Sequence, residues 1–417
     1  MNFSGGQGLE RVRLVCAWCG AGRPADLDPW CHVCGGSLVA ENDGAAALLE
    51  SWKSFSEIAS LLPAGGKLVS LGEGNTPLVS LARLCGEDTV HAKADWMNPT
   101  GSFKDRGAAV AVSAALGLGA EGVVCASTGN NATSVSAYAA RAGLPCIITL
   151  SSSTPASKVA HARAYGATLV EVDGTFSDAY HMAEAIRLAA PRWANLTSTY
   201  ANPYMTAAHA TIFYELCRQL GSAPGTIIVP IGAGPMLGGI LQGAEHLLRR
   251  GEISRLPVLV GVQSAGCAPI ARAFEAGRET VEEWTGADFG IAGSINDPLR
   301  GYPADGTRTL RDIRRTGGFA VAVEDTEIQA AMSDLARYEG IAAEPAAAAP
   351  LAALRRLIGH HDLPRPITLV ISGHALKDPG ALPATSPRLS ARDGKGPLDF
   401  IAAATAYSAG TLQPPAN

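Results

Sequence analysis

Hydrophobic and polar positions in the middle of the chain follow two alternating patterns. Short apolar runs rich in β-branched residues predict strands at residues 90–94, 122–126, 145–150 and 168–172. Segments with apolar positions at helical spacing follow them, at residues 103–116, 131–142, 155–165 and 176–189. This strand–helix order predicts a parallel sheet with helices on both faces.

The same order returns after Pro203, with strand-like runs at residues 226–230, 257–263, 319–323 and 366–371. Residues 40–62 are predicted to form a helical link, and residues 398–405 a short helix in a tail rich in Pro, Ser, Ala and Gly. A chain of 417 residues is long enough for about two to three domains.

Composition and charge narrow the classes of partner. The net charge is −5, charged residues make up 17% of the chain, and acids and bases are interspersed, so neither nucleic acid nor a membrane surface is indicated. The polar start has no apolar core of a signal peptide, and no run reaches the roughly 18 apolar residues of a spanning helix. We therefore expect a cytoplasmic protein.

Cysteines are used in two ways. Five of the nine are scattered through apolar runs, which predicts buried, inert thiols in a reducing compartment. The other four form two C-x-x-C pairs, each followed by glycine and separated by eleven residues: Cys16, Cys19, Cys31 and Cys34. This spacing predicts two knuckles around one structural zinc ion. A redox pair, an iron site and a metal-free knuckle are the alternatives.

One lysine stands out by its place in the predicted pattern. Lys104 falls in the first turn of the helix predicted at residues 103–116, with Ser102 placed as N-cap and Asp105 completing a capping box. The positive end of a helix disfavours an ammonium group there. A lysine of lowered pKa on such a turn suits a Schiff base with a carbonyl, above all that of pyridoxal phosphate. The alternative is a solvated surface lysine.

Two further strand-to-helix turns could bind anions. Residues 127–131 read Ser-Thr-Gly-Asn-Asn, whose amides and side chains suit a carboxylate, although a plain N-cap cluster is the alternative. Residues 231–239 hold four glycines between a strand and a helix, so their backbone N–H groups could cradle a phosphate. A tight structural turn would give the same pattern.

Taken in series, these motifs resemble the threonine synthase family, fold-type-II pyridoxal-phosphate enzymes of the tryptophan-synthase-β superfamily. The resemblance covers about residues 11–380 and is carried by the cysteine pairs and by the motifs at residues 72–78, 98–107, 127–130, 232–239 and 373–379. It implies an α/β fold of two three-layer αβα domains behind a zinc-knuckle segment. The implied boundaries are 1–45 for the knuckle segment, 46–100 plus 201–385 for a larger domain, 101–200 for a smaller domain, and 386–417 for a tail.

The resemblance also implies a role for each matching residue. Lys104 would carry the cofactor and move protons at the substrate carbons, Asn130 would hydrogen-bond its 3′-oxygen, and Ser372 would face its pyridine nitrogen. The cofactor phosphate would be held by Gly232, Ala233, Gly234, Pro235 and Gly238. The substrate carboxylate would lie on the turn that contains Ser127, Thr128 and Asn131.

One stretch departs from the family pattern. Met205 stands where the family has the arginine that, with the positions of Thr199 and Tyr200, holds the phosphate of O-phosphohomoserine. The basic residues that could compensate are Lys158, Arg163 and His209.

The implied activity is that of a lyase, by elimination and replacement at the β or γ carbon of an amino acid. Threonine synthesis from O-phosphohomoserine is the nearest named reaction. Because of Met205, the alternative is another substrate, by cysteate-synthase-like β-replacement, serine or threonine dehydration, or a specialised biosynthetic step. A homodimer is also implied, since relatives are commonly dimers.

Overall fold

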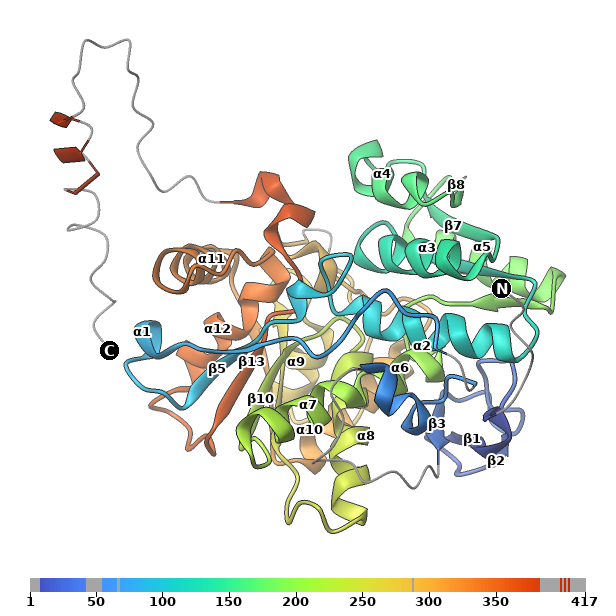
Figure 1. The fold of residues 1–417 in the computed structure, drawn as a ribbon, viewed down its shortest axis with the longest axis horizontal. Coiled ribbons are helices and arrows are strands. Elements are labelled where there is room, and N and C mark those ends of the chain that lie inside the picture. The colour runs from blue at the N-terminus through green and yellow to red at the C-terminus, as the bar shows by residue number, and fades with distance from the viewer. Residues whose placement is uncertain are drawn as a thin grey trace.

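The computed structural model describes residues 8–42, 55–65, 68–286 and 289–382, and six helical residues at 398–399, 401–402 and 404–405. Its strands form three sheets, two of which are flanked by helices (Figure 1). Short 3₁₀ helices lie between these elements, at Leu9–Arg11, Phe55–Leu61, Asp95–Met97, Gly293–Ile295, Ala375–Lys377 and Pro379–Ala381.

The largest sheet has six strands, and all neighbours are parallel except the edge strand β4. In spatial order the strands are β12 (Phe319–Val323), β11 (Val258–Ser264), β10 (Thr226–Pro230), β13 (Ile367–Val370), β5 (Val90–Lys93) and β4 (Leu78–Ser80). Alternate side chains of β10 enter different cores, because successive residues of a strand point to opposite faces. The sheet is therefore buried on both faces.

Ile227 and Val229 pack in one core with four helices: α7 (Ala210–Leu220), α8 (Pro235–Arg249), α9 (Pro269–Glu275) and α10 (Pro303–Arg315). Ile228 packs on the opposite face with α1 (Ala82–Cys85), α11 (Asp325–Glu339) and α12 (Pro345–Leu357). This arrangement is a three-layer αβα unit.

The smaller sheet is wholly parallel, in the order β8 (Thr168–Val172), β7 (Cys146–Ser151), β6 (Gly122–Ala126) and β9 (Trp193–Asn195). One face packs against α5 (Phe176–Ala189). The other shares a core with α2 (Lys104–Gly117), α3 (Asn130–Ala142) and α4 (Ala156–Ala164). A second three-layer unit results.

The cysteine-bearing segment forms a third, antiparallel sheet from β1 (Val12–Cys16), β2 (Gly22–Pro24) and β3 (Leu38–Asn42). It lies next to α6 (Pro203–Ala208) and α2 (Figure 1). Leu14 and Leu38 share a core with Ala111 of α2 and Met205 of α6. The segment therefore packs onto the helix that begins with Lys104.

The strands and helices predicted from the hydrophobic pattern are confirmed to within one residue at each end. The pattern did not predict β4, β9 or the three strands of the cysteine-bearing segment, most of which are short. The helical link predicted at 40–62 is wrong at its ends: residues 40–42 belong to β3, and residues 55–61 form a 3₁₀ helix. Residues 43–54 lie outside the described part.

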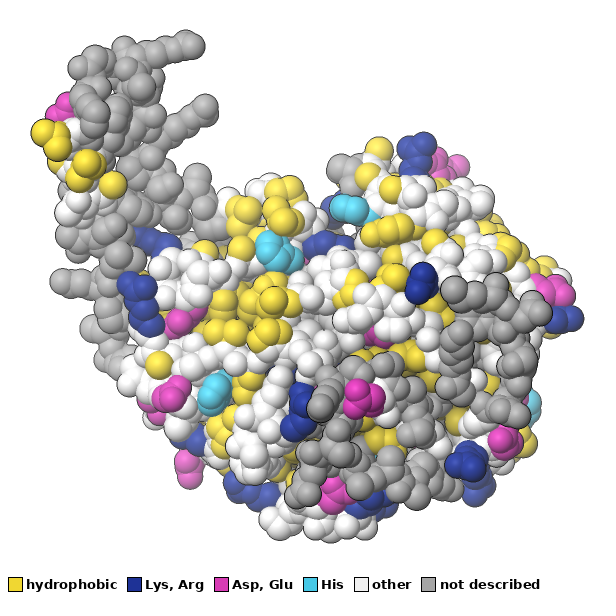
Figure 2. Space-filling model, in the orientation of Figure 1, with side chains coloured by type: hydrophobic (Ala, Val, Ile, Leu, Met, Phe, Trp, Pro, Cys, Tyr) yellow, Lys and Arg dark blue, Asp and Glu magenta, His cyan; other side chains and the backbone are white. Residues whose placement is uncertain are grey.

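In the described part of the tail, all six residues between 398 and 405 are helical. On the face shown in Figure 2, the described acidic and basic side chains are interspersed, in keeping with the net charge of −5. Among the described residues, no helix combines the length and apolar character needed to cross a membrane.

Candidate active site

Lys104 is the first residue of α2 and projects from the helix start towards the chain that follows β9. Its ammonium donates a hydrogen bond to the hydroxyl of Ser198 and lies 4.5 Å from the centre of the Phe103 ring. Ser198 is 94 residues away in sequence, so its proximity could not be read from local spacing.

Burial lowers the pKa of Lys104 to about 8. The nearby groups Cys125, Glu344 and Asp297 oppose this shift by favouring the charged form. An amine with such a pKa exists in both protonation states near neutral pH, which suits a residue that must act as base and then as acid.

The capping box predicted for Ser102 and Asp105 is wrong. The Ser102 hydroxyl is buried without a hydrogen-bond partner, and its backbone forms a bridge to Gly373. Asp105 instead accepts hydrogen bonds from the backbone N–H and hydroxyl of Thr100, at 2.6 and 2.7 Å, and from Ser134. The bridge to Gly373 takes Ser102 away from the capping position, and Thr100 replaces it as the partner of Asp105.

A buried cluster of charges fixes α2 two residues after Lys104. The Arg106 guanidinium donates to Asp95 at 2.8 Å and to Glu215 at 2.5 Å. Lys93 also contacts Glu215, at 2.6 Å, and all four side chains are fully buried. Buried charges of this kind hold their geometry because breaking one pair leaves an uncompensated charge. The cluster ties the start of α2 to β5 and α7.

Asn130 is the first residue of α3, and its amide nitrogen donates to both oxygens of Glu344, at 2.9 and 3.1 Å. Glu344 immediately precedes α12, and its carboxylate lies against Gly373, the neighbour of Ser372. The Ser372 carbonyl in turn accepts from the N–H of Phe103 at 2.9 Å. The structure thus brings three residues with predicted cofactor roles together: Lys104, Asn130 and Ser372.

The glycine loop runs from β10 into α8, and Gly234 at its centre has a left-handed φ of 101°. Thr309 of α10 donates to the Ala233 carbonyl at 2.5 Å, and a Cβ on Gly234 would collide with the Thr309 hydroxyl. Asp297 packs against Gly232 on the same loop. Pro235 at the start of α8 has no N–H, and the Gly238 N–H donates to the Gly234 carbonyl at 3.0 Å. The N–H groups of Met236 and Leu237 therefore remain without a partner within the helix and suit an anion such as a phosphate.

Of the residues predicted to bind the substrate carboxylate, two are partly exposed and the third is engaged in hydrogen bonds within the protein. Ser127 and Thr128 are partly exposed at the end of β6. The amide nitrogen of Asn131 is engaged by the Leu196 carbonyl at 2.9 Å and by the Cys125 sulfur at 3.0 Å. Asn131 therefore links α3 to the end of β9.

The side chains of the stretch around Met205, which departs from the family pattern, are engaged in contacts within the protein. The Tyr200 hydroxyl donates to the Gly234 carbonyl at 3.1 Å and lies 3.0 Å from the Thr309 hydroxyl. The Thr199 hydroxyl accepts from the N–H of Ala201, and Met205 is buried against Gly107 in the core shared with the cysteine-bearing segment. Neither Tyr200 nor Met205 offers a free polar group for a phosphate.

Of the three basic residues that could compensate for Met205, His209 packs with Met205 against Gly107. His209 is fully buried, and burial, followed by the charges of Lys104 and Arg106, lowers its pKa well below the usual value. It is therefore neutral. Lys158 and Arg163 are exposed on α4, and Arg163 lines a hollow beside β7 and β8 whose lining does not include Lys104.

The four cysteines of the N-terminal segment lie together, with all four sulfurs within 4.8 Å of one another. The Cys16–Cys34 and Cys19–Cys31 sulfur distances are 3.4 and 3.7 Å, close to the roughly 3.8 Å expected around tetrahedral zinc. Both knuckles have the same backbone form. In each, the glycine N–H donates to the first cysteine's carbonyl, and the glycine has a left-handed φ: Gly20 and Gly35.

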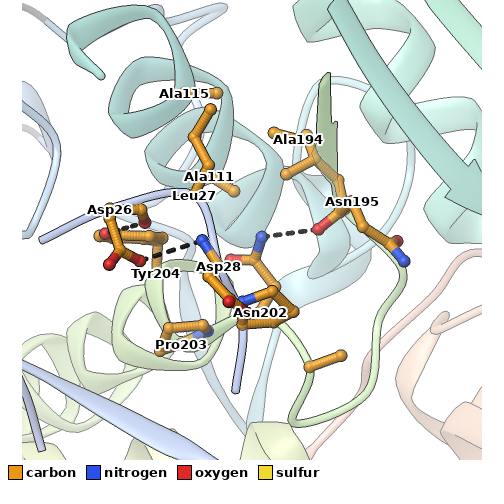
Figure 3. Close-up of a pocket in the computed structure, with 13 residues that line it drawn as sticks. Asp26, Leu27, Asp28, Ala111, Ala115, Ala194, Asn195, Asn202, Pro203 and Tyr204 are labelled. Carbon is orange, nitrogen blue, oxygen red and sulfur yellow. Dashed lines mark hydrogen bonds between the residues drawn. The ribbon is translucent and has the colours of Figure 1, made fainter. Parts of the chain in front are cut away.

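A small cavity separates the cysteine-bearing segment from α2 and α6 (Figure 3). Its volume of about 10 Å³ is close to the minimum for one water molecule. Tyr204 closes one side by donating to the Asp26 carbonyl at 2.7 Å, and Asn202 donates to the Asn195 carbonyl at 3.0 Å. The cavity is a packing defect in this contact, and its lining does not include Lys104.

Comparison with known proteins agrees with this geometry. The family model described as "Pyridoxal-phosphate dependent enzyme" matches residues 69–373. This chain belongs to that family. It is a pyridoxal-phosphate-dependent lyase of the threonine-synthase-like kind, because its sequence relatives are threonine synthases.

The threonine synthase of Methanosarcina acetivorans is 36% identical, over 88% of this chain and 92% of the relative. That of Methanocaldococcus jannaschii is 39% identical, over 76% and 78%. Among solved structures, a threonine deaminase from T.th. matches with a TM-score of 0.61 and 27% identity, over 72% of this chain and 92% of that one. Maize serine racemase shares the fold at 23% identity, with a TM-score of 0.62 over 72% and 88% of the two chains.

Sequence reasoning missed three polar residues around Lys104. They are Ser198, Asp297 and Glu344. Ser198 directly precedes the stretch in which substrate residues were predicted, and Glu344 precedes a helix that begins with proline. The sequence therefore gave a weak indication of a functional role for Ser198 and Glu344 and none for Asp297.

Proposed function

We propose that the residues around Lys104 bind pyridoxal phosphate and catalyse elimination and replacement at the β or γ carbon of an amino acid. Threonine synthesis, in which O-phosphohomoserine and water give threonine and phosphate, is the reaction to test first. The main support is that two carboxylates connect Lys104 with the other predicted cofactor residues. Glu344 contacts Asn130 and Gly373, the neighbour of Ser372, and Asp297 contacts the glycine loop. Both carboxylates also favour the charged form of Lys104.

The residues present fit the cofactor. The glycine loop and the start of α8 would hold its phosphate, Asn130 its 3′-oxygen, Ser372 its ring nitrogen and Lys104 its aldehyde carbon. When bound, pyridoxal phosphate withdraws electrons from the substrate, which makes protons on its carbons acidic.

Lys104 would take the proton from the substrate Cα and later return a proton, since its amine titrates near neutral pH. Ser198 would orient that amine through its hydrogen bond. Ser127 and Thr128 would bind the substrate carboxylate at the start of α3. The buried charges around Arg106 would keep the start of α2 in place during proton transfer.

A second candidate is the same chemistry on a substrate with another leaving group. Its support is the stretch around Met205: the thioether is buried, the Tyr200 hydroxyl is bonded to the glycine loop, and His209 is neutral. A phosphate dianion would find no guanidinium there. Serine or threonine dehydration needs no phosphate-binding cation, and cysteate-synthase-like β-replacement stays an alternative.

The deciding experiment has two stages. Purified protein should show the visible absorbance of bound cofactor, and Lys104→Ala should abolish it. Product formation is then measured from O-phosphohomoserine, O-phosphoserine, O-acetylated homologues, serine and threonine. Turnover of O-phosphohomoserine alone supports threonine synthesis, whereas turnover of another substrate alone supports the second candidate. A wild-type protein without the absorbance band would contradict both.

The N-terminal cysteines would hold one structural zinc ion. Four thiolates fill a tetrahedral shell and leave no position for a substrate water, so the ion would stabilise the segment and take no part in the reaction. We also place the protein in the cytoplasm and expect a homodimer. Gel filtration with light scattering tests the assembly.

A further inference from the structure

Glu344 has a buried carboxylate that has no role in the steps of the proposed reaction. The side chain is 4% exposed and stands at the N-cap position of α12, yet it does not cap that helix. Both carboxylate oxygens are instead turned to the amide nitrogen of Asn130, 214 residues earlier in the chain.

Gly373 makes this position possible. A Cβ at Gly373 would meet both carboxylate oxygens of Glu344, one of them at 3.0 Å. The backbone N–H of Glu344 donates to the Gly373 carbonyl at 3.1 Å, which holds the carboxylate against the turn that contains Ser372. The carboxylate therefore lies between Asn130 and Ser372, the two side chains proposed to contact the cofactor ring.

A primary amide nitrogen carries two hydrogens, and one of them is enough for the bond to Glu344. The amide cannot turn over, because its oxygen would then face the carboxylate. We propose that Glu344 is a positioning residue, which fixes the Asn130 amide so that its second N–H points at the 3′-oxygen of the cofactor. This inference rests on the proposed function, since it takes the cofactor to lie beside Asn130.

The charges around Glu344 make its effect dependent on pH. Burial raises the pKa of Glu344 to about 7, while the Asn130 hydrogen bond and Lys377 oppose the rise. Asp378 and Lys104 are the other charged groups that act on it. Protonation below pH 7 removes the negative charge but leaves one carbonyl oxygen to accept from Asn130. The charge beside the bound cofactor therefore changes in that range, while the Asn130 amide stays oriented.

The test measures the dissociation constant of pyridoxal phosphate, and its bound absorbance between pH 5.5 and 8.5, in full-length variants. Glu344→Ala and Asn130→Ala should each weaken binding by about tenfold, since an oriented hydrogen bond is lost in both. The double variant should be no weaker than Asn130→Ala, because Glu344 acts through Asn130. Glu344→Gln should restore binding to within about threefold of wild type, since its carbonyl still accepts from Asn130.

The pH dependence separates this role from a purely structural one. Wild type should show a change in cofactor absorbance near pH 7 that Glu344→Gln lacks. Glu324→Gln, at the equivalent N-cap of α11, is the matched control and should keep wild-type affinity and absorbance. Multiplicative losses in the double variant, or an unchanged pH step in Glu344→Gln, would overturn the inference alone. A wild-type chain that binds no cofactor would overturn it together with the proposed function.

Discussion

The guanidinium of Arg308 lies over the ring of Tyr200, 4.0 Å from its centre. The same group donates to the hydroxyl of Ser37 at 3.0 Å and to the carbonyl of Leu38 at 3.3 Å, in the cysteine-bearing segment. Tyr200 in turn donates to the Gly234 carbonyl. Arg308 therefore joins the N-terminal segment to the loop proposed to hold the cofactor phosphate.

Arg308→Ala should weaken cofactor binding by about three- to tenfold and lower the free energy of unfolding by about 2–3 kcal/mol, since a cation–π contact and two hydrogen bonds are lost. Arg311→Ala is the matched control, because Arg311 lies over Trp18 of the same segment, 4.4 Å from the ring centre. It should leave cofactor affinity unchanged. Titration with pyridoxal phosphate and urea unfolding measure the two effects, and equal losses of affinity in both variants would contradict the coupling.

Metal removal should loosen the N-terminal segment. Elemental analysis should find about one zinc ion per chain, and a strong chelator should lower the Tm, since structural zinc contributes directly to folding. Cys31→Ser should lose both the metal and the effect of the chelator. Cys85→Ser, a half-buried cysteine outside the cluster, should behave as wild type. Metal-free protein with an unchanged Tm would refute the site.

The rate at which the apoprotein takes up pyridoxal phosphate should rise with pH between about 6.5 and 8.5 and then level off. The pKa of Lys104 is lowered from 10.5 to about 8, so the neutral amine, which reacts with an aldehyde, becomes the main form above pH 8. Stopped-flow absorbance across this range measures the midpoint. A midpoint near pH 10.5 would show that the amine is solvated instead.

The buried cluster around Arg106 should make the protein sensitive to acid. Burial opposes ionisation of Glu215, but the charges of Arg106 and Lys93 outweigh it and lower its pKa from 4.5 to about 2. The stabilisation is therefore complete above pH 4.5 and is lost as the pH falls towards 2. Glu215→Gln should cost about 3–5 kcal/mol at pH 7 and reduce the pH dependence in this range.

An exposed ion pair provides the comparison for that experiment. Glu282 pairs with Arg278 at the surface, so Glu282→Gln should change the free energy of unfolding by less than about 1 kcal/mol. Urea unfolding between pH 2 and 7 measures both variants. Similar losses in the free energy of unfolding of the two variants would mean that burial does not increase the contribution of the cluster to stability.

Met205→Arg should not create a phosphate site. The Met205 side chain is 2% exposed and packs against Gly107 beside His209, so an arginine there would bury an unpaired charge. We expect a loss of several kcal/mol in the free energy of unfolding and no gain in phosphate release from O-phosphohomoserine. Met205→Leu, similar in volume, should stay within about 1.5 kcal/mol of wild type. A stable Met205→Arg variant with increased phosphate release would show that position 205 reaches the substrate.

The sequence predictions that proved correct were based on local sequence patterns. Apolar runs and helical spacing predicted the parallel strands and their helices, because each pattern spans only a few neighbouring residues. The same holds for the position of Lys104 at the start of α2. The zinc site predicted from the cysteine pairs stays a proposal, and the structure shows that the four sulfurs lie together. Motifs of this kind also placed the chain in its family before any contact was known.

The partners of these residues were decided by tertiary structure. Ser198, Asp297 and Glu344 reach Lys104 or Asn130 from segments far away in the sequence, and the position of Ser102 depends on a bridge to Gly373. The burial that lowers the pKa of Lys104 likewise comes from the packing of distant segments. The amino-acid sequence by itself determined most of the strands and helices and several side chains with predicted chemistry, because these depend on neighbours along the chain. Which groups face one another, and whether they are charged, was decided only when the packing of distant segments removed water from between them.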